Sequence, residues 1–334
     1  MSLKWRLEKR TLPLRFVWKI ARGTLVKKES YFVSTCDSEQ SFLGYGEVAP
    51  NTRYHNTPEV IERDFQTFLD SALIAPQIAE FTLQEFGAWL DRLSLCNTLR
   101  FGIESAWVHF QSNKENKTVG EFLGVPRAPQ IQTSFSVPIM EPAELEAFLR
   151  PLARFHALKI KVDAETAVEA LDRITRLTSQ KLRIDGNEAF DDPAALMHFV
   201  EGLRGKNIEF LEQPMPASMK DAYREILPRL PFPLIGDESI EDHADFADLA
   251  AQFSGVNIKL MKTGGYVRAI ELLKGARAHG LKTMLGCMVE TSLGISSAMH
   301  LASLIDYADL DGFLLLKDDP FGLAREADGF LHFS

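Results

Sequence analysis

The chain has 334 residues, of which 46% are hydrophobic and 25% are charged, and its formal net charge is −9. This length exceeds what one small core needs and suits a large domain together with a smaller unit. The acidic balance argues against nucleic acid or an anionic membrane as a partner, and no run of residues approaches the ~20 apolar positions of a membrane span.

The N-terminal part of the chain, residues 1–125, is expected to form an α+β unit of its own. Alternating apolar and polar residues are typical of an antiparallel meander and predict strands over 5–18, 24–35 and 42–49. Apolar residues at helical spacing then predict helices over 58–73, 83–93 and 97–111. Strands followed by helices in this way indicate a separate α+β domain.

From residue 126 to 316, short strands and helices alternate. Strands are predicted over 132–137, 157–162, 182–185, 208–211, 234–236, 256–261, 282–285 and 313–316. Eight strands that alternate with seven helices predict a parallel barrel, although the alternation alone also fits an open doubly wound sheet. Residues 317–334 are too few for another unit, and we expect them to pack back on the N-terminal one.

Charged residues stand at the ends of five of these strands, at intervals of roughly 25 residues, which is about one strand, one helix and their loops. They are Lys161, Asp185, Glu212, Asp237 and Lys262. In a parallel barrel such residues converge on one mouth, where catalysis takes place. The three carboxylates would repel one another unless a divalent cation neutralised them. Ligation by oxygen alone favours Mg²⁺, with Mn²⁺ a close substitute, and disfavours zinc.

The lysines indicate proton transfer. Lys159 and Lys161 lie two residues apart on a strand and therefore share a face. Mutual repulsion and burial lower a lysine pKa toward the range of roughly 7–8 that a general base needs. Lys262, predicted on the sixth strand, would face this pair across the barrel. Lys259 is a competing candidate, but with Lys262 inward it tends to the opposite face, so we prefer Lys262.

A set of motifs, in this order and spacing, resembles the muconate-lactonizing-enzyme subgroup of the enolase superfamily. The motifs are Lys-x-Lys at 159–161, Asp-Gly-Asn at 185–187, Glu-Gln-Pro at 212–214, Asp-Glu-Ser at 237–239 and Lys-x-Gly-Gly at 262–265. The resemblance spans about 132–319 and implies an N-terminal capping domain over a (β/α)7β barrel, a modified TIM barrel.

The same resemblance implies the contents of the site. One Mg²⁺ per subunit would be bound by Asp185, Glu212 and Asp237, with Lys161 and Lys262 as the acid/base pair. The superfamily uses a Lys or His base with Mg²⁺ in this way. Asn187 and Glu238 are expected beside the ligands, where they hold them in place.

Two motifs near the end of the predicted barrel limit the class of substrate that is expected. An Asp-x-Asp at Asp309 and Asp311 resembles the dipeptide epimerases, where such a pair is associated with the substrate's α-ammonium group, and two carboxylates select a cationic amine on physical grounds as well. The segment 286–292 also resembles this family, so the backbone near Cys287 and Met288 is expected to contact the dipeptide.

Further substrate contacts are expected from two loops of the capping domain, 18–24 and 50–57, which would close over the site. In these loops, Arg22 and Arg53 are candidates for a second substrate carboxylate, as in Ala-Glu dipeptides. Lys159 is expected to keep the pKa of its neighbour low and to touch the substrate carboxylate.

The predicted reaction is epimerisation of the C-terminal residue of a dipeptide, L-Ala-D/L-Glu or a related pair, by 1,1-proton transfer between two lysines. A cycloisomerase, an o-succinylbenzoate synthase or an N-acylamino acid racemase on the same scaffold remains an alternative, and an uncharged group in place of Asp309 and Asp311 would have favoured it. A third alternative is a barrel that binds a ligand without catalysis. Lys161 and Lys262 argue against it, because binding alone requires no pair of opposed bases. The charged start and three scattered cysteines predict a cytoplasmic protein with free thiols, and a homo-oligomer stays open.

Overall fold

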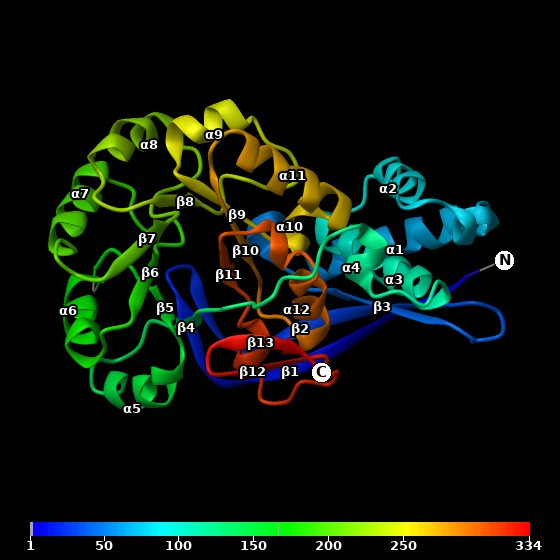
Figure 1. Ribbon diagram of the computed structural model, residues 1–334, viewed down its shortest axis with the longest axis horizontal. Helices are drawn as coiled ribbons and strands as arrows, with labels where there is room; N and C mark the ends of the chain where they lie inside the picture. The colour runs from blue at the N-terminus through cyan, green and yellow to red at the C-terminus, as the bar shows by residue number, and fades with distance from the viewer. Residues whose placement is uncertain (1–2, 166) are drawn as a thin grey trace.

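The N-terminal sheet consists of one long hairpin and a short third strand. The computed structural model describes residues 3–165 and 167–334. Strands β1 (Lys4–Ile20), β2 (Gly23–Cys36) and β3 (Leu43–Val48) are antiparallel and adjacent in that order, as predicted. β1 and β2 pair from Lys4↔Cys36 to Ile20↔Gly23, with a shift of register between Pro13 and Trp18. Only two residues connect the strands, so they form a tight hairpin. The turn of this hairpin extends toward the barrel (Figure 1).

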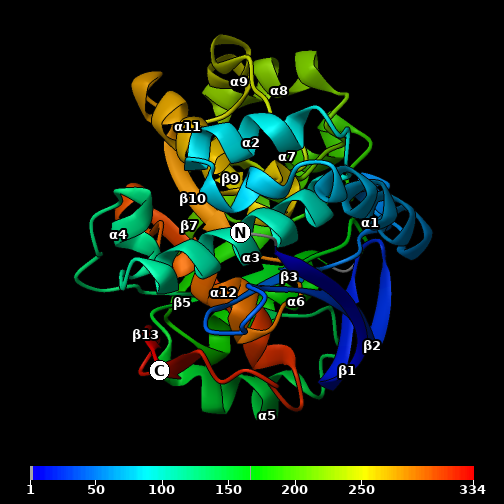
Figure 2. The same ribbon diagram turned by 90° about the vertical axis from the view of Figure 1, so that its right-hand side faces the viewer.

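Helices α1 (Pro58–Leu73), α2 (Leu83–Asp91), α3 (Asn97–Lys114) and α4 (Val119–Leu123) complete this unit beside the sheet (Figure 2). Thr57 caps α1 by accepting a hydrogen bond from the Val60 amide, which satisfies a donor at the helix start. α3 packs directly on β3. A Cβ at Gly46 would lie 1.9 Å from the Gly102 carbonyl oxygen, so a glycine is required for this approach.

The second unit is an eight-stranded parallel barrel. Its strands pair in chain order and are β4 (Phe135–Val137), β5 (Ala157–Lys161), β6 (Lys181–Asp185), β7 (Ile208–Glu212), β8 (Leu234–Gly236), β9 (Gly255–Ile258), β10 (Lys282–Gly286) and β11 (Tyr307–Asp309). A parallel bridge between Thr133 and Ala308 joins the first strand region to the last. The predicted barrel is therefore confirmed, and the open doubly wound sheet is not observed.

Helices lie on the outside of the strands, and most of them run along the left and top in Figure 1. They are α5 (Leu145–Leu149), α6 (Ala167–Leu177), α7 (Pro193–Gly202), α8 (Lys220–Ile226), α9 (Phe246–Gln252), α11 (Tyr266–Ala278) and α12 (Ser292–Met299). The apolar stripe of α6 buries Leu171 and Ile174, as the helical spacing indicates. In the part of the chain that the structure describes, no helix has both the length and the apolar character that a membrane span requires.

The barrel interior is layered, which explains why the charged residues gather at one end. The lower layer contains Phe210, Ile235 and Met284, closed by Tyr307. The guanidinium of Arg183 lies over two of these rings, 5.3 Å from Phe210 and 5.5 Å from Tyr307. Side chains two residues further along a strand point the same way. The next layer toward the carboxyl ends is therefore made by the acids of the strand-end motifs.

Two of the predicted strands are wrong in detail. The eighth strand is Tyr307–Asp309, and residues 313–316 lie mainly in a 3₁₀ helix, η6 (Gly312–Leu315). A short apolar run does not by itself distinguish a buried strand from a buried helical turn. The sixth strand ends at Ile258, and Lys262 lies on a short helix, α10 (Leu260–Thr263), not on the strand.

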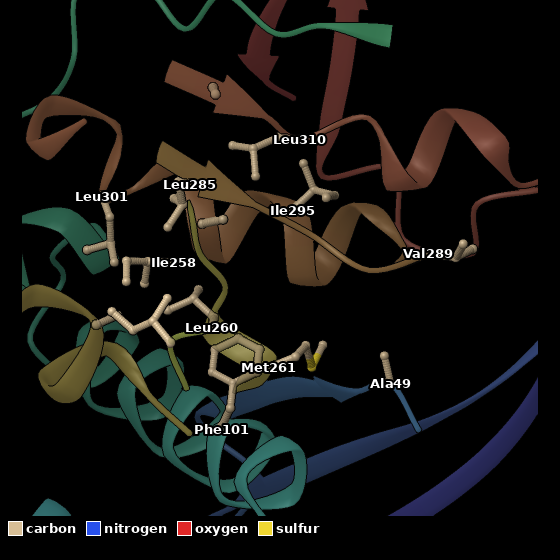
Figure 3. Close-up of a cluster of buried hydrophobic side chains, with 14 of the residues drawn as sticks. Ala49, Phe101, Ile258, Leu260, Met261, Leu285, Val289, Ile295, Leu301 and Leu310 are labelled. Atoms are coloured by element: carbon tan, nitrogen blue, oxygen red, sulfur yellow. The ribbon is translucent and has the colours of Figure 1, made fainter. Parts of the chain in front are cut away.

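The two units share a continuous apolar core, because α3 packs against α10. Figure 3 shows Phe101 of α3 below Leu260 and Met261 of α10. The C-terminal segment contacts both units. Its residue Lys317 donates from its amide to the Pro13 carbonyl, while the hairpin of β12 (Ala324–Ala327) and β13 (Phe330–Phe333) bridges to Gln132.

Candidate active site

A cavity of about 140 Å³ lies between the tip of the β1–β2 hairpin and the carboxyl ends of the barrel strands. Eight residues predicted for the site line it: Arg22, Lys159, Lys161, Asn187, Cys287, Met288, Asp309 and Asp311. The wall also contains residues not predicted, among them Trp18, Ile20, Leu25, Lys28, Asn51, Ser136 and Lys259. The tertiary structure thus brings strand ends, hairpin and the segment after β10 to one place.

Lys159 is the charged centre of the barrel mouth. Its ammonium group lies 2.9 Å from Asp185 Oδ2, 2.9 Å from Glu212 Oε2 and 2.8 Å from Asp309 Oδ2. Burial alone lowers the pKa of Lys159, but these carboxylates outweigh it, so the pKa stands well above its usual value. Lys159 is therefore a fixed cation that links two of the predicted metal ligands to the eighth strand.

Two other lysines reach the cavity from opposite sides. Lys161 Nζ lies 2.6 Å from Asp185 Oδ2, and Lys259 Nζ lies 2.7 Å from Asp237 Oδ2. Lys161 ends β5 and Lys259 directly follows β9, four strands away in an eight-stranded barrel. Each amine thus stands at the mouth beside a different carboxylate, across the barrel from the other.

The structure gives Lys262 a different place from the predicted one. Its side chain is fully buried, whereas those of Lys161 and Lys259 retain 10% and 9% exposure. Its ammonium donates to Asp237 Oδ1 at 2.5 Å, to the Asp237 carbonyl at 2.6 Å and to the Asn257 carbonyl at 3.1 Å. Because the chain coils after Ile258, strand alternation does not extend to residue 262. The preference for Lys262 over Lys259 as the inward residue is therefore wrong in geometry.

The carboxylates Asp185, Glu212 and Asp237 lie at the ends of neighbouring strands and are buried. Among residues 3–165 and 167–334, no three acidic, histidine or cysteine side chains already converge on one point as a metal cluster. Ammonium groups compensate the acids instead. Burial raises the pKa of Glu212 to about 7, with the charges of Asp185 and Asp237 acting in the same direction. In Asp185 and Asp237, lysines overcome burial and lower the pKa.

Several buried oxygens around these acids are well suited to a cation. Within the described part of the chain, Asn187 Oδ1, Asn257 Oδ1 and Glu238 Oε2 are buried and accept no hydrogen bond, and Glu212 Oε2 has only its ion pair with Lys159. Buried acceptors of this kind are costly unless something compensates them. A hard cation prefers such carboxylate and amide oxygens. The residue set therefore fits Mg²⁺ chemically.

Asp309, the last residue of β11, and Asp311, two residues later, contribute the acidic part of the cavity wall. Asp309 accepts from Ser134 Oγ at 2.7 Å, in addition to its ion pair with Lys159. Asp311 accepts from the Ser136 amide at 2.5 Å, and burial followed by the charge of Asp309 raises its pKa to about 7. Both acids line the cavity.

The capping domain reaches the mouth through its two predicted loops. Arg22, at the hairpin turn, lies 2.6 Å from Glu238 Oε1 and lines the cavity. Arg53, in the loop after β3, pairs with Glu188 at 2.8 Å and 2.9 Å and lies outside the cavity lining. Neither arginine is a free cation. Whether either meets a substrate carboxylate stays a prediction.

Sequence reasoning missed Asn257 and Gln213. Asn257 Nδ2 donates to Glu212 Oε1 at 2.8 Å, so residue 257 faces the barrel interior and residue 259, two further along, does too. The spacing of two residues between Asn257 and Lys259 is visible in the sequence, so it could have indicated that Lys259 faces the interior. Gln213 accepts from the Asp237 amide at 2.8 Å and donates to Ser239 Oγ at 2.9 Å. Gln213 belongs to the Glu-Gln-Pro motif, but its backbone φ of +30° and its contacts with the loop after β8 were not predicted from that motif.

Comparisons with known proteins show the family to which the chain belongs. The sequence model of a family described as enolase C-terminal domain-like matches residues 144–322. The chain is 33% identical to an L-Ala-D/L-amino acid epimerase of Pedosphaera parvula, over 97% of this chain and 94% of that protein. It is 30% identical to a hydrophobic dipeptide epimerase of Flavobacteria bacterium MS024-2A, over 95% and 92% of the two chains.

Among solved structures, the fold is similar to a dipeptide epimerase from Methylococcus capsulatus, described as complexed with Mg and the dipeptide L-Arg-D-Lys. The TM-score is 0.88 at 25% identity, covering 100% of this chain and 98% of that one. The match to the barrel family and the full-length relatives confirm the resemblance predicted from the motifs. The chain therefore belongs to the enolase superfamily, among relatives that are named dipeptide epimerases.

Proposed function

We propose that this protein epimerises the C-terminal residue of a dipeptide by moving a proton between two lysines. The observation that carries the proposal is the placement of Lys161 and Lys259, which reach one cavity from strands on opposite sides of the barrel. Inversion at a carbon requires a base on one face and an acid on the other. A binding protein would gain nothing from two such amines.

The proton transfer uses Lys161 and Lys259 in place of the pair Lys161 and Lys262. One amine, when neutral, removes the α-proton, and the protonated amine across the cavity delivers another to the opposite face. Lys262 helps to position Lys259, because both ammonium groups form ion pairs with the Asp237 carboxylate, one with each oxygen. Lys159 supplies fixed positive charge beside the substrate carboxylate.

The substrate would be oriented by charge at both ends. Asp309 and Asp311 offer a negative wall for the α-ammonium group of the dipeptide. Asp185, Glu212 and Asp237 would hold one Mg²⁺, with Mn²⁺ a substitute, while Asn187 and Glu238 flank the ligands. When bound, Mg²⁺ makes the α-proton more acidic by stabilising negative charge on the substrate carboxylate. Lactones and succinylbenzoate carry no ammonium group, so the acidic wall favours dipeptides over the alternative reactions.

The test is isotope exchange in D₂O with Mg²⁺ and a panel of dipeptides, followed by proton NMR. Deuterium at the α-carbon of the C-terminal residue, with both epimers formed, is the expected result. Exchange at no dipeptide, with the folded protein and added Mg²⁺, would remove the proposal. Conversion of an N-acylamino acid faster than any dipeptide would favour the racemase alternative instead. We place the activity in the cytoplasm, consistent with the free thiols of Cys36, Cys96 and Cys287.

A further inference from the structure

Helix α3 of the capping domain carries a buried ion pair that lies outside the cavity. Arg100 and Glu104 are one helical turn apart, with Arg100 Nη1 2.8 Å from Glu104 Oε2, and their side chains are only 2% and 0% exposed. Apolar side chains of similar size often stabilise a core as well as such a pair does. The contacts that the pair makes with other segments therefore indicate its role.

Both members of the pair hold the barrel backbone that follows β9. Arg100 Nη1 donates to the carbonyl of Gly264, the residue after α10. Glu104 Oε1 accepts from the amide of Val267, in the first turn of α11, at 3.3 Å. Gly265, which precedes α11, has no side chain to accept from the free amides at the helix start, so the Glu104 carboxylate does this. A Cβ at Gly265 would lie 2.4 Å from both carboxylate oxygens, so the fit is close.

Helix α10 is a single turn, and Lys259 is the residue before it. The Lys259 carbonyl accepts from the Lys262 amide at 2.9 Å and from the Thr263 amide at 3.0 Å. The Gly264 amide closes the turn by donating to the Leu260 carbonyl at 3.0 Å. An isolated turn of helix is unstable, because fixing its backbone brings few hydrogen bonds in return. The turn therefore depends on the contacts that α3 makes with its end.

The two cavity lysines differ in what supports their backbone. Lys161 is the last residue of β5, which is hydrogen-bonded to β4 on one side and to β6 on the other. Lys259 lies beyond Ile258, the last paired residue of β9. Figure 3 shows Phe101, the neighbour of Arg100 on α3, beneath the α10 turn. The position of Lys259 thus depends on the capping domain, whereas that of Lys161 depends on the barrel sheet.

We infer that Arg100 and Glu104 are positioning residues for Lys259, because they fix the turn from which this lysine reaches the cavity. The inference rests on the proposed epimerase function. A helix of the capping domain thus sets the geometry of one proton-transfer face and leaves the other to the barrel. A misplacement of about 1 Å can cost about 10²-fold in rate. Displacing the turn should therefore slow the epimer whose α-proton Lys259 removes.

Two variants displace the turn without touching the cavity. Glu104→Gln keeps the side-chain size, but its single amide oxygen can accept from Arg100 or from Val267, whereas the carboxylate accepts from both. Arg100 keeps Asp91 Oδ1 as a partner at 2.7 Å, so its charge stays compensated. Arg100→Lys keeps the charge beside Glu104 but loses the planar fork of donors that also reaches Gly264. If Glu104→Gln does not fold, Arg100→Lys decides.

The test follows α-proton exchange of each epimer separately by proton NMR in D₂O, with saturating Mg²⁺ and a dipeptide that the wild type epimerises. Lys259→Ala identifies the epimer that this lysine serves. In both test variants, kcat for that epimer should fall about 10²-fold, while the other epimer keeps its wild-type rate and both KM values stay unchanged. A variant that is only less stable would lose both rates in proportion to its folded fraction, which circular dichroism measures.

Glu326→Gln is the matched control. Glu326, on β12, has a side chain that is 6% exposed, and it accepts from Arg154 Nη2 at 2.9 Å and from the Gly329 amide at 2.8 Å. Its loss should leave the ratio of the two exchange rates unchanged. If Glu104→Gln and Arg100→Lys slow both epimers equally, or neither, the inference is overturned while the wild type still epimerises. Exchange with no dipeptide in the wild type removes the proposed function, and the inference with it.

Discussion

Replacing each cavity lysine singly distinguishes the two proton-transfer faces. In Lys259→Ala, the amine beside Asp237 is lost while Lys161 keeps its pairing with Asp185. Inversion needs both faces, so conversion of one epimer into the other should nearly stop. Exchange with solvent needs only one base. The epimer whose α-proton points at Lys161 should therefore still incorporate deuterium, without inversion.

The size of the effect follows from the role of the group. A positioned general acid or base contributes roughly 10²- to 10⁴-fold to a rate, so we expect inversion to fall about 10³-fold in Lys259→Ala. That corresponds to a rise of about 4 kcal/mol in the activation free energy. Lys161→Ala should show the mirror image, with loss of inversion and exchange retained only in the other epimer.

The assay follows each epimer separately by proton NMR in D₂O, with circular dichroism to confirm that each variant is folded. Lys262→Met is the matched control. Lys262 holds the carbonyl and carboxylate of Asp237 from below, so its loss should lower stability and slow both epimers alike. One-sided exchange in Lys262→Met, together with ordinary inversion in Lys259→Ala, would refute the assignment of Lys259.

Three further results are expected. Gly286→Ala would place a Cβ 2.6 Å from Asn257 Oδ1 and push that side chain off Glu212, so the free energy of unfolding in urea should fall by about 1–3 kcal/mol; unchanged stability would contradict this. Burial, followed by the charge of Glu47, raises the pKa of Glu290 from 4.5 to about 8. The folded state therefore holds this proton more tightly, and stability should fall as the pH rises from 4.5 to 8. In Glu290→Gln, the loss of unfolding free energy between pH 5 and pH 8, measured by urea titration, should be smaller by ~3 kcal/mol. An equal loss in the variant and the wild type would show that Glu290 does not cause this pH dependence. EDTA should abolish exchange and lower the melting temperature, with Mg²⁺ restoring both, because an ion that binds only the folded protein stabilises it; full activity in EDTA would exclude a required metal.

The order and type of the elements were predictable because their signals are local. Alternation over the first strands, helical spacing in α1–α3 and the regular strand–helix repeat each depend on neighbouring residues alone. The strand-end positions of Asp185, Glu212 and Asp237 followed from the same repeat. The errors occurred where a short apolar run had two local solutions, as at 313–316, and where a strand ended earlier than its composition suggested, as before Lys262.

The chain alone thus determined the barrel, its family and the chemical identity of the residues at its mouth, since periodicity and motif spacing are properties of consecutive residues. Tertiary structure decided which lysine faces the cavity, because that depends on where β9 ends and α10 begins. It also decided what the arginines do. Arg22 and Arg53 meet Glu188 and Glu238 only after the capping domain folds over the barrel, and no local pattern records the charges that two distant segments bring together.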